Sequence, residues 1–137
     1  MTFFLEHWQT SQGPWLILHQ ASDHSGALTR LMALFESLAE ADAGTIVRLH
    51  EQDFIQTTLR FDLLVLSSGP HRLRQEAEGW TWSCTADLWQ DHAARLGPND
   101  RKYPTRWHQY FEQHPADDAE LVLSVGEYPD RLCETVV

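Results

Sequence analysis

One segment of the chain carries a helical repeat of apolar residues, and this repeat constrains the fold more than any other feature. Within residues 24–41 the apolar side chains recur at spacings of three and four, which places them on one face of a helix. These side chains are Leu28, Leu31, Met32, Phe35, Leu38 and Ala39. Ser22, Asp23 or Ser25 is suited to cap the start of this helix, and Gly44 follows its end. The pattern predicts an amphipathic helix packed against a core.

Other segments alternate with a period of two, which is typical of strands. In residues 57–67 four apolar side chains share one face: Leu59, Phe61, Leu63 and Val65. Leu64 and Leu66 interrupt the polar side of the same segment. A strand that is apolar on both sides is usually covered on both sides, so we expect the later half of this strand to be covered on both faces.

Further strands are predicted at residues 2–8, 15–19, 45–51, 71–77, 79–84 and 120–125. The first two are expected to form one hairpin, and residues 71–77 and 79–84 a second. A second helix is predicted at residues 85–96, between Thr85 as its cap and Gly97-Pro98 as its end. A short third helix is predicted at residues 105–113. The 137 residues fit a single domain over residues 1–137, of class α+β. We expect a mainly antiparallel sheet with two or three helices packed on one face.

No stretch approaches the roughly 18 uninterrupted apolar residues of a membrane span. The first residues lack a basic leader, and Glu6 falls where the apolar core of a signal peptide would lie. The two cysteines, Cys84 and Cys133, are too few and too far apart for a disulfide framework. These features predict a cytoplasmic protein.

Charge limits the classes of partner. Twenty acidic residues against ten basic ones give a net charge of −10, which nucleic acid or an anionic membrane would repel. The excess is concentrated from Glu112 to the end, where seven acidic residues accompany one arginine, Arg131. The charge therefore favours a basic protein as partner.

Motifs for catalysis or cofactor binding are missing from the sequence. The eight histidines show no metal-ligand spacing, and the seven glycines form no phosphate-binding loop. Cys84 precedes the predicted second helix, whose amino-terminal end can stabilise a thiolate, and folding could bring His92 or His71 close enough to act as its base. We expect no cofactor and no metal, and we keep a small hydrolase using Cys84 and His92 as a minor alternative.

Aromatic residues are abundant, with six tryptophans. Trp107, Tyr110 and Phe111 lie at helical spacing, and exposed tryptophan and tyrosine are frequent hot spots of protein interfaces. In size, acidity and lack of catalytic motifs the chain is similar in kind to the bacterial immunity proteins and antitoxins that bind basic nuclease toxins. We therefore predict a non-catalytic inhibitor that binds a basic protein partner such as a toxin nuclease. The predicted partner-binding residues are Trp107, Tyr110, Glu112, Asp117, Asp118 and Glu120. A small-ligand-binding or structural accessory subunit, with the aromatic residues lining a pocket, is the main alternative.

Overall fold

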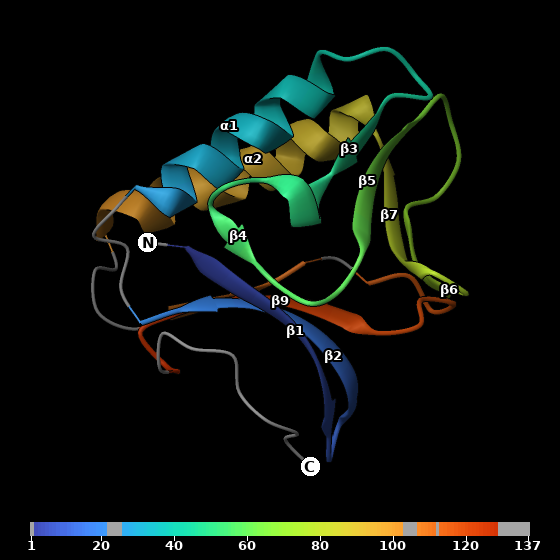
Figure 1. The fold of residues 1–137 in the computed structure, drawn as a ribbon. Helices are drawn as coiled ribbons and strands as arrows, with labels where there is room; N and C mark the ends of the chain where they lie inside the picture. Colours follow the sequence, from blue (N-terminus) through green and yellow to red (C-terminus); the bar gives the residue numbers. More distant parts are fainter. Residues whose placement is uncertain (1, 22–25, 103–106, 112, 129–137) are drawn as a thin grey trace.

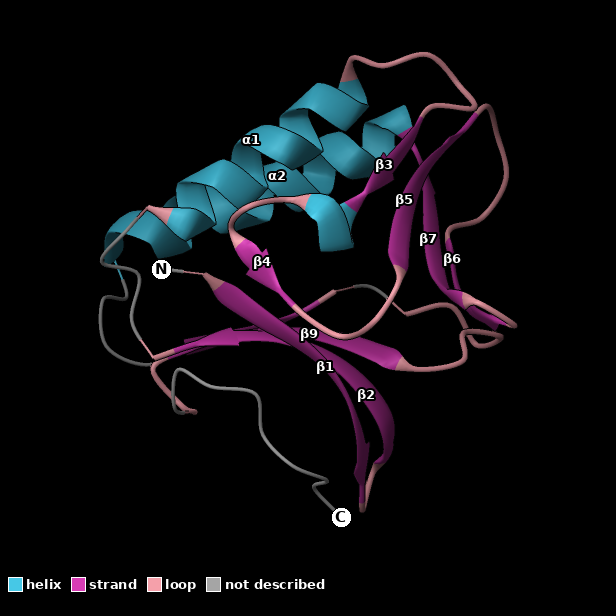
Figure 2. Ribbon diagram, viewed as in Figure 1, coloured by secondary structure: helices cyan, strands magenta, loops and turns pink. Residues whose placement is uncertain are grey.

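The fold combines two mixed sheets with two helices (Figures 1 and 2). The computed structural model describes residues 2–21, 26–102, 107–111 and 113–128, with only the backbone described at 97–102 and 107. Its strands are β1 (Phe3–Thr10), β2 (Gly13–Gln20), β3 (Ile46–Arg48), β4 (Ile55–Gln56), β5 (Phe61–Leu66), β6 (Arg72–Glu76), β7 (Gly79–Thr85), β8 (Trp107–Tyr110) and β9 (Glu120–Val125). The helices are α1 (Ala27–Ala39) and α2 (Ala86–Lys102), and Leu49–Glu51 forms a 3-10 turn.

The five-stranded sheet has the order β4-β1-β2-β9-β8. The hairpin of β1 and β2 is antiparallel and pairs Trp8 with Trp15, and β8 is antiparallel to β9. The contacts of β1 with β4 and of β2 with β9 are parallel. A strand from near the carboxyl end of the chain therefore lies beside the amino-terminal hairpin.

The four-stranded sheet has the order β3-β5-β7-β6. Here β5 and β7 are parallel, while β3 and β6 flank them as antiparallel edge strands. The hairpin of β6 and β7 turns at Ala77-Glu78, and Gly79, the first residue of β7, has a φ of +153° that other residues rarely adopt.

One continuous core joins both sheets and both helices. The helices α1 and α2 lie side by side against the core-facing side of the four-stranded sheet (Figure 1). At the centre Trp82 of β7 meets Trp89 of α2 with ring centroids 4.8 Å apart, and Phe35 of α1 lies 5.5 Å from Trp89. Such aromatic contacts bury large areas and favour edge-to-face geometry. Among the described residues no helix has the length and hydropathy needed to span a membrane.

The α+β class is confirmed, and so are helix α1, strand β9 and both hairpins. The strands form two sheets where one was expected, and both sheets are mixed and not purely antiparallel. The parallel pairs join strands that are not consecutive, such as β2 and β9, and apolar periodicity carries no information about such pairing. The expected capping residues at 22–25 lie outside the described residues, and α1 has Gly26 as its N-cap without a side-chain hydrogen bond.

Two helix predictions and one strand prediction need correction. Residues 107–110 form strand β8 and not a helix, because their backbone pairs with β9, with Tyr110 opposite Val122. Tertiary pairing of this kind overrides a short helical pattern. Helix α2 continues through Gly97-Pro98 to Lys102, and the strand expected at 45–51 is shortened to β3 followed by the 3-10 turn.

Candidate functional site

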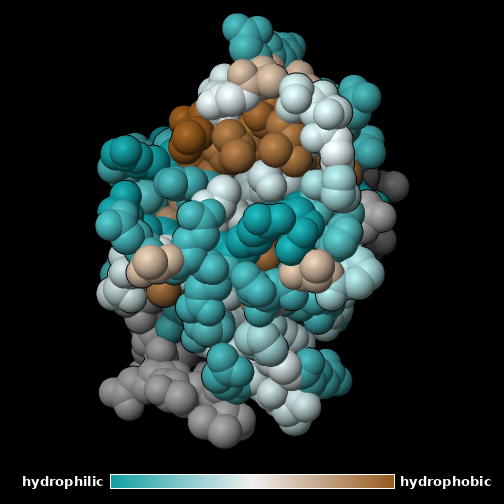
Figure 3. Space-filling view, turned by 90° about the vertical axis from the view of Figure 1, so that its right-hand side faces the viewer, coloured by the Kyte–Doolittle hydropathy of each residue, from teal (hydrophilic) through white to brown (hydrophobic). Residues whose placement is uncertain are grey.

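The outer face of the four-stranded sheet is open on the side shown in Figure 3. Along β5 the side chains alternate: Phe61, Leu63 and Val65 are buried on the core side, whereas the residues between them are only partly buried. Successive side chains of a strand point to opposite faces, so Asp62, Leu64 and Leu66 lie on the outer face. Both helices lie on the opposite side of this sheet.

An apolar patch occupies the upper part of this face. It consists of Ile46 of β3 with Leu64 and Leu66 of β5. Figure 3 shows a hydrophobic area in the upper part of this side of the molecule. Ile46 lies directly opposite Leu64 in the sheet and is 58% exposed. An exposed apolar patch on a monomer is a frequent mark of an interaction site.

A shallow hollow of about 440 Å³ adjoins the apolar patch at Leu66. Its other walls combine the small side chains of Ala41, Ala43 and Ala86 with the polar side chains of Ser67, Thr85 and Asp87. Such walls leave room for a side chain from another molecule, with apolar contacts beside polar partners.

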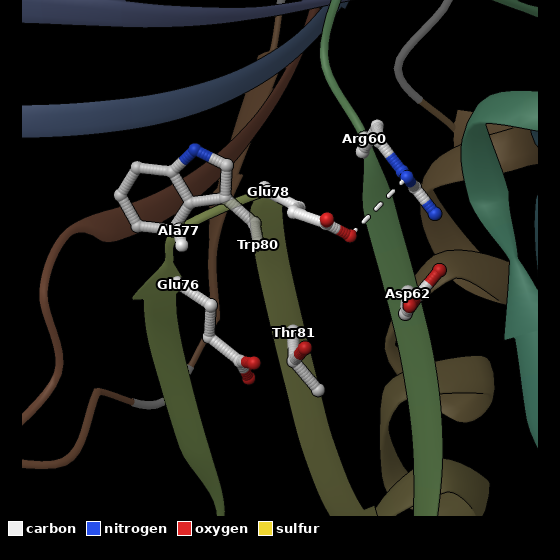
Figure 4. A pocket seen from close by; sticks show the side chains of 8 residues that line it. Arg60, Asp62, Glu76, Ala77, Glu78, Trp80 and Thr81 are labelled. Carbon is white, nitrogen blue, oxygen red and sulfur yellow. Dashed lines mark ion pairs between the residues drawn. The ribbon is translucent and has the colours of Figure 1, made fainter.

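An acidic groove of about 320 Å³ lies along the same sheet, at the other end of β5 (Figure 4). Its charged side chains are Arg60, Asp62, Glu76 and Glu78. Three carboxylates accompany one guanidinium, which leaves a net charge of −2. Arg60 and Glu78 form an ion pair of 3.5 Å, in which the arginine side chain is about half exposed and the glutamate side chain is largely exposed. The groove therefore presents negative charge to solvent.

Two details of the backbone and side chains shape this groove. Oδ1 of Asp62 is buried and has no hydrogen-bond partner among the described residues, which is costly for a carboxylate oxygen. At Gly79 an added Cβ would lie 2.5 Å from the carbonyl oxygen of Arg60, because the two strands approach closely there. The amide of Trp80 donates a hydrogen bond of 2.8 Å to that same oxygen. The groove wall thus depends on a glycine at position 79.

Asp117 and Asp118, two of the predicted partner-binding residues, contact the edge of strand β6. Asp117 accepts hydrogen bonds from the backbone amides of Leu73 (2.8 Å) and His114 (2.9 Å), and its side chain is only 4% exposed. Asp118 accepts one from the amide of Gln75 at 2.7 Å. These carboxylates satisfy donors of an edge strand that would otherwise be open to pairing. Both residues therefore have a structural role, and their partner role stays a prediction.

Two of the other predicted residues, Tyr110 and Glu120, lie on the outer face of the five-stranded sheet. Tyr110 is 41% exposed, and its ring centroid is 6.2 Å from that of Trp15. Glu120 shares this face with Tyr110, because it precedes by two positions the residue that pairs with Tyr110. Trp107 belongs to β8, where only its backbone is described, and Glu112 lies outside the described residues.

Most of that second face is closed by its own side chains. Trp8, Ile17 and Val122 are buried there, with Trp15 and Tyr128 packed against them. Nearby, His19 and Glu6 are both buried and lie 2.6 Å apart, between Nε2 and Oε2. The outer face of the five-stranded sheet thus forms a second, smaller core.

The structure brings Cys84 and His92 together, but it buries both. Sγ of Cys84 lies 3.6 Å from Nε2 of His92, and both residues are almost fully inaccessible. Burial raises the pKa of the Cys84 thiol far above its ordinary value, and the negative charge of Asp117 adds to this rise. Burial, with smaller contributions from the charges of Arg95 and His71, lowers the pKa of His92 to about 3. At neutral pH both side chains are therefore uncharged, which is the opposite of an activated thiolate–imidazolium pair.

No group of three or more histidine, cysteine or acidic side chains is placed to hold a metal ion within the described part of the chain. Comparison with known proteins found no matching family, no matching characterised protein and no matching solved structure. Function therefore has to be argued from the surface itself.

Sequence reasoning missed the residues of the open face. The signal was present at Leu64 and Leu66, whose apolar character on the polar side of β5 led to the prediction that this half of the strand is covered on both faces. In the structure they are only partly buried and border the exposed Ile46. The groove residues come from β5, β6 and the turn before β7, so no local pattern connects them.

Proposed function

We propose that this protein is a non-catalytic binding protein whose partner is a basic protein. The acidic groove beside an exposed apolar patch is the observation that supports this proposal most directly. Negative charge steers a basic partner to the surface and speeds association, while apolar contacts slow its dissociation. The net charge of −10 acts in the same direction over a longer range.

Within this class we propose an inhibitor of the immunity or antitoxin type, directed at a basic toxin nuclease. A nuclease presents a positively charged surface to its substrate, so an acidic protein of this size is suited to occupy that surface. The burial of Cys84 and His92 argues for binding and against thiol chemistry.

Capture from a lysate of the source organism tests the proposal. The immobilised protein is washed at low and then at high salt, next to a Glu76→Lys/Glu78→Lys variant of the groove. A Glu36→Lys/Glu40→Lys variant has the same net charge but changes exposed residues at helix α1, so it is the matched control. We expect the wild type and the control to retain a basic protein that high salt releases, and the groove variant to lose it.

The outcomes separate the possibilities. Elution of the wild type without any basic protein contradicts the proposal. Equal loss in both variants means that only overall charge matters, and the groove then has no special role. If the retained protein is a nuclease whose activity falls on binding, the inhibitor role is established as well.

A further inference from the structure

We infer that the basic partner docks at two points of the open face, with an apolar side chain on the apolar patch and an arginine or lysine in the acidic groove. This inference rests on the proposed function and specifies which surface and which partner chemistry it uses. The two points lie on one strand, since Leu66 and Asp62 are both outward-facing residues of β5.

The strand fixes the distance between the two points. Leu66 and Asp62 are four residues apart, which corresponds to about 13 Å along a strand. Leu64 lies between them on the same face. The partner therefore presents its apolar and basic side chains about 13 Å apart on one docking element.

The apolar point consists of side chains that remain exposed to solvent. Ile46 is 58% exposed although β-branched apolar residues are usually buried, and it borders two leucines that are themselves only partly buried. The adjoining hollow at Leu66 has space for one apolar side chain. A partner residue at this position removes apolar surface of both molecules from water, which favours association.

The charged point contains an acceptor without a donor. Among the described residues the buried Oδ1 of Asp62 has no hydrogen-bond partner, while Arg60 pairs with Glu78 and Glu76 lies exposed at the groove. A guanidinium or ammonium group that enters the groove would supply hydrogen-bond donors of the matching charge. A second copy of this chain is a poor occupant, because two chains of net charge −10 repel each other.

A defined probe tests the two-point mode. A phage-displayed library of random dodecapeptides is selected on the immobilised full chain, and the enriched peptides are measured against variants in solution. Ile46→Glu is the decisive variant because it removes an apolar side chain and adds a negative charge. Charge steering alone predicts equal or tighter binding to it, whereas an apolar anchor predicts weaker binding.

We expect the enriched peptides to combine a basic residue with a large apolar one. Their dissociation constants should rise about tenfold or more for Ile46→Glu, and also for Glu76→Lys/Glu78→Lys. Binding should change less than about twofold for Ile46→Val, which keeps the patch apolar, and for Tyr110→Glu, which makes a similar change on the other sheet. Circular dichroism of each variant checks that the fold is intact.

Three results would overturn the inference. Peptides that bind Ile46→Glu as tightly as the wild type remove the apolar point but leave the proposed function standing. If no enriched peptide depends on this face for binding, neither docking point exists as inferred. The capture experiment then tests the proposed function separately. A dimer of the free protein that Ile46→Glu dissociates assigns the patch to a second copy.

Discussion

The two sheets of this protein share one core but differ in how far the apolar side chains on their outer faces are buried. On the five-stranded sheet, Ile17 and Val122 are buried under tryptophan and tyrosine side chains. On the four-stranded sheet, Ile46 is 58% exposed beside two half-buried leucines and an acidic groove. Both faces bear apolar residues, but among the described residues the five-stranded sheet buries its outer apolar side chains, whereas those of the four-stranded sheet stay exposed or partly buried.

This difference in coverage indicates which apolar residues stabilise the fold and which are available to bind another molecule. Apolar residues that the chain covers itself contribute to stability, because their burial is part of folding. Apolar residues that stay exposed contribute little to stability and are available for an interface. The comparison is consistent with a structural role for one outer face and supports the proposed binding role of the other.

Reactivity of the buried thiol gives the largest expected effect. In a Cys133→Ser background, so that Cys84 is the one cysteine, alkylation near neutral pH should be about a thousandfold slower than for a free cysteine, because the thiol is buried and protonated. Mass spectrometry of the native and the denatured protein measures this ratio. A rate equal to that of free cysteine would move the functional site from the open face to Cys84 and His92.

Matched isoleucine substitutions compare the two faces directly. Ile17→Ala should lower the free energy of unfolding by about 3.5 kcal/mol, because it leaves a cavity among fully buried side chains. Ile46→Ala should lower it by about 0.5 kcal/mol, because this side chain is already largely in water. Chemical denaturation measures both values, and similar losses would erase the distinction between the faces.

A pH series tests whether the core beneath the open face is dry. The pKa of His92 is about 3 in the folded protein and about 6.5 in the unfolded chain, so below pH 6.5 the unfolded chain binds a proton that the folded protein excludes. Stability is therefore highest above pH 6.5 and falls as the pH drops towards 3. From pH 7 to pH 4 the wild type should lose about 3 kcal/mol more than His92→Gln. Equal losses of stability in the two proteins would mean that His92 binds a proton as easily in the folded protein as in the unfolded chain.

The stability of the protein should depend more on the carboxylate of Asp117 than on that of Asp118, although both contact the edge strand β6. Asp117→Ala leaves two backbone donors without their partner and should cost about 2 kcal/mol. Asp118→Ala removes a single, more exposed acceptor and should cost about 0.5 kcal/mol. Thermal unfolding with circular dichroism compares them, and equal costs would contradict the proposed role of Asp117 in holding strand β6.

The sequence predicts local elements well and tertiary pairing poorly. The spacing of Leu28, Leu31 and Phe35 identifies helix α1, and the alternation along β5 identifies its buried side. The parallel pairing of β2 with β9 joins residues about a hundred positions apart, and no local pattern encodes it. Strand β8 was predicted as helix because aromatic spacing was considered without its partner strand.

The candidate site is a harder case for the same reason. Asp117 and Asp118 look like free surface charges in the sequence, and only the fold shows that they bind the backbone of β6. Asp62, Glu76 and Glu78 form a groove only once three segments assemble. The apolar character of Leu64 and Leu66 predicted coverage on both faces, whereas in the structure both side chains are only partly buried on the outer face.

The most direct measurement is a methyl NMR spectrum of the isoleucine-, leucine- and valine-labelled protein, recorded alone and with the basic protein identified in the capture experiment. If the open face is the binding surface, the methyl signals of Ile46, Leu64 and Leu66 shift or broaden on binding, while those of Ile17 and Val122 stay in place. Shifts confined to Ile17 and Val122, with Ile46 unchanged, would place the partner on the five-stranded sheet and contradict the account.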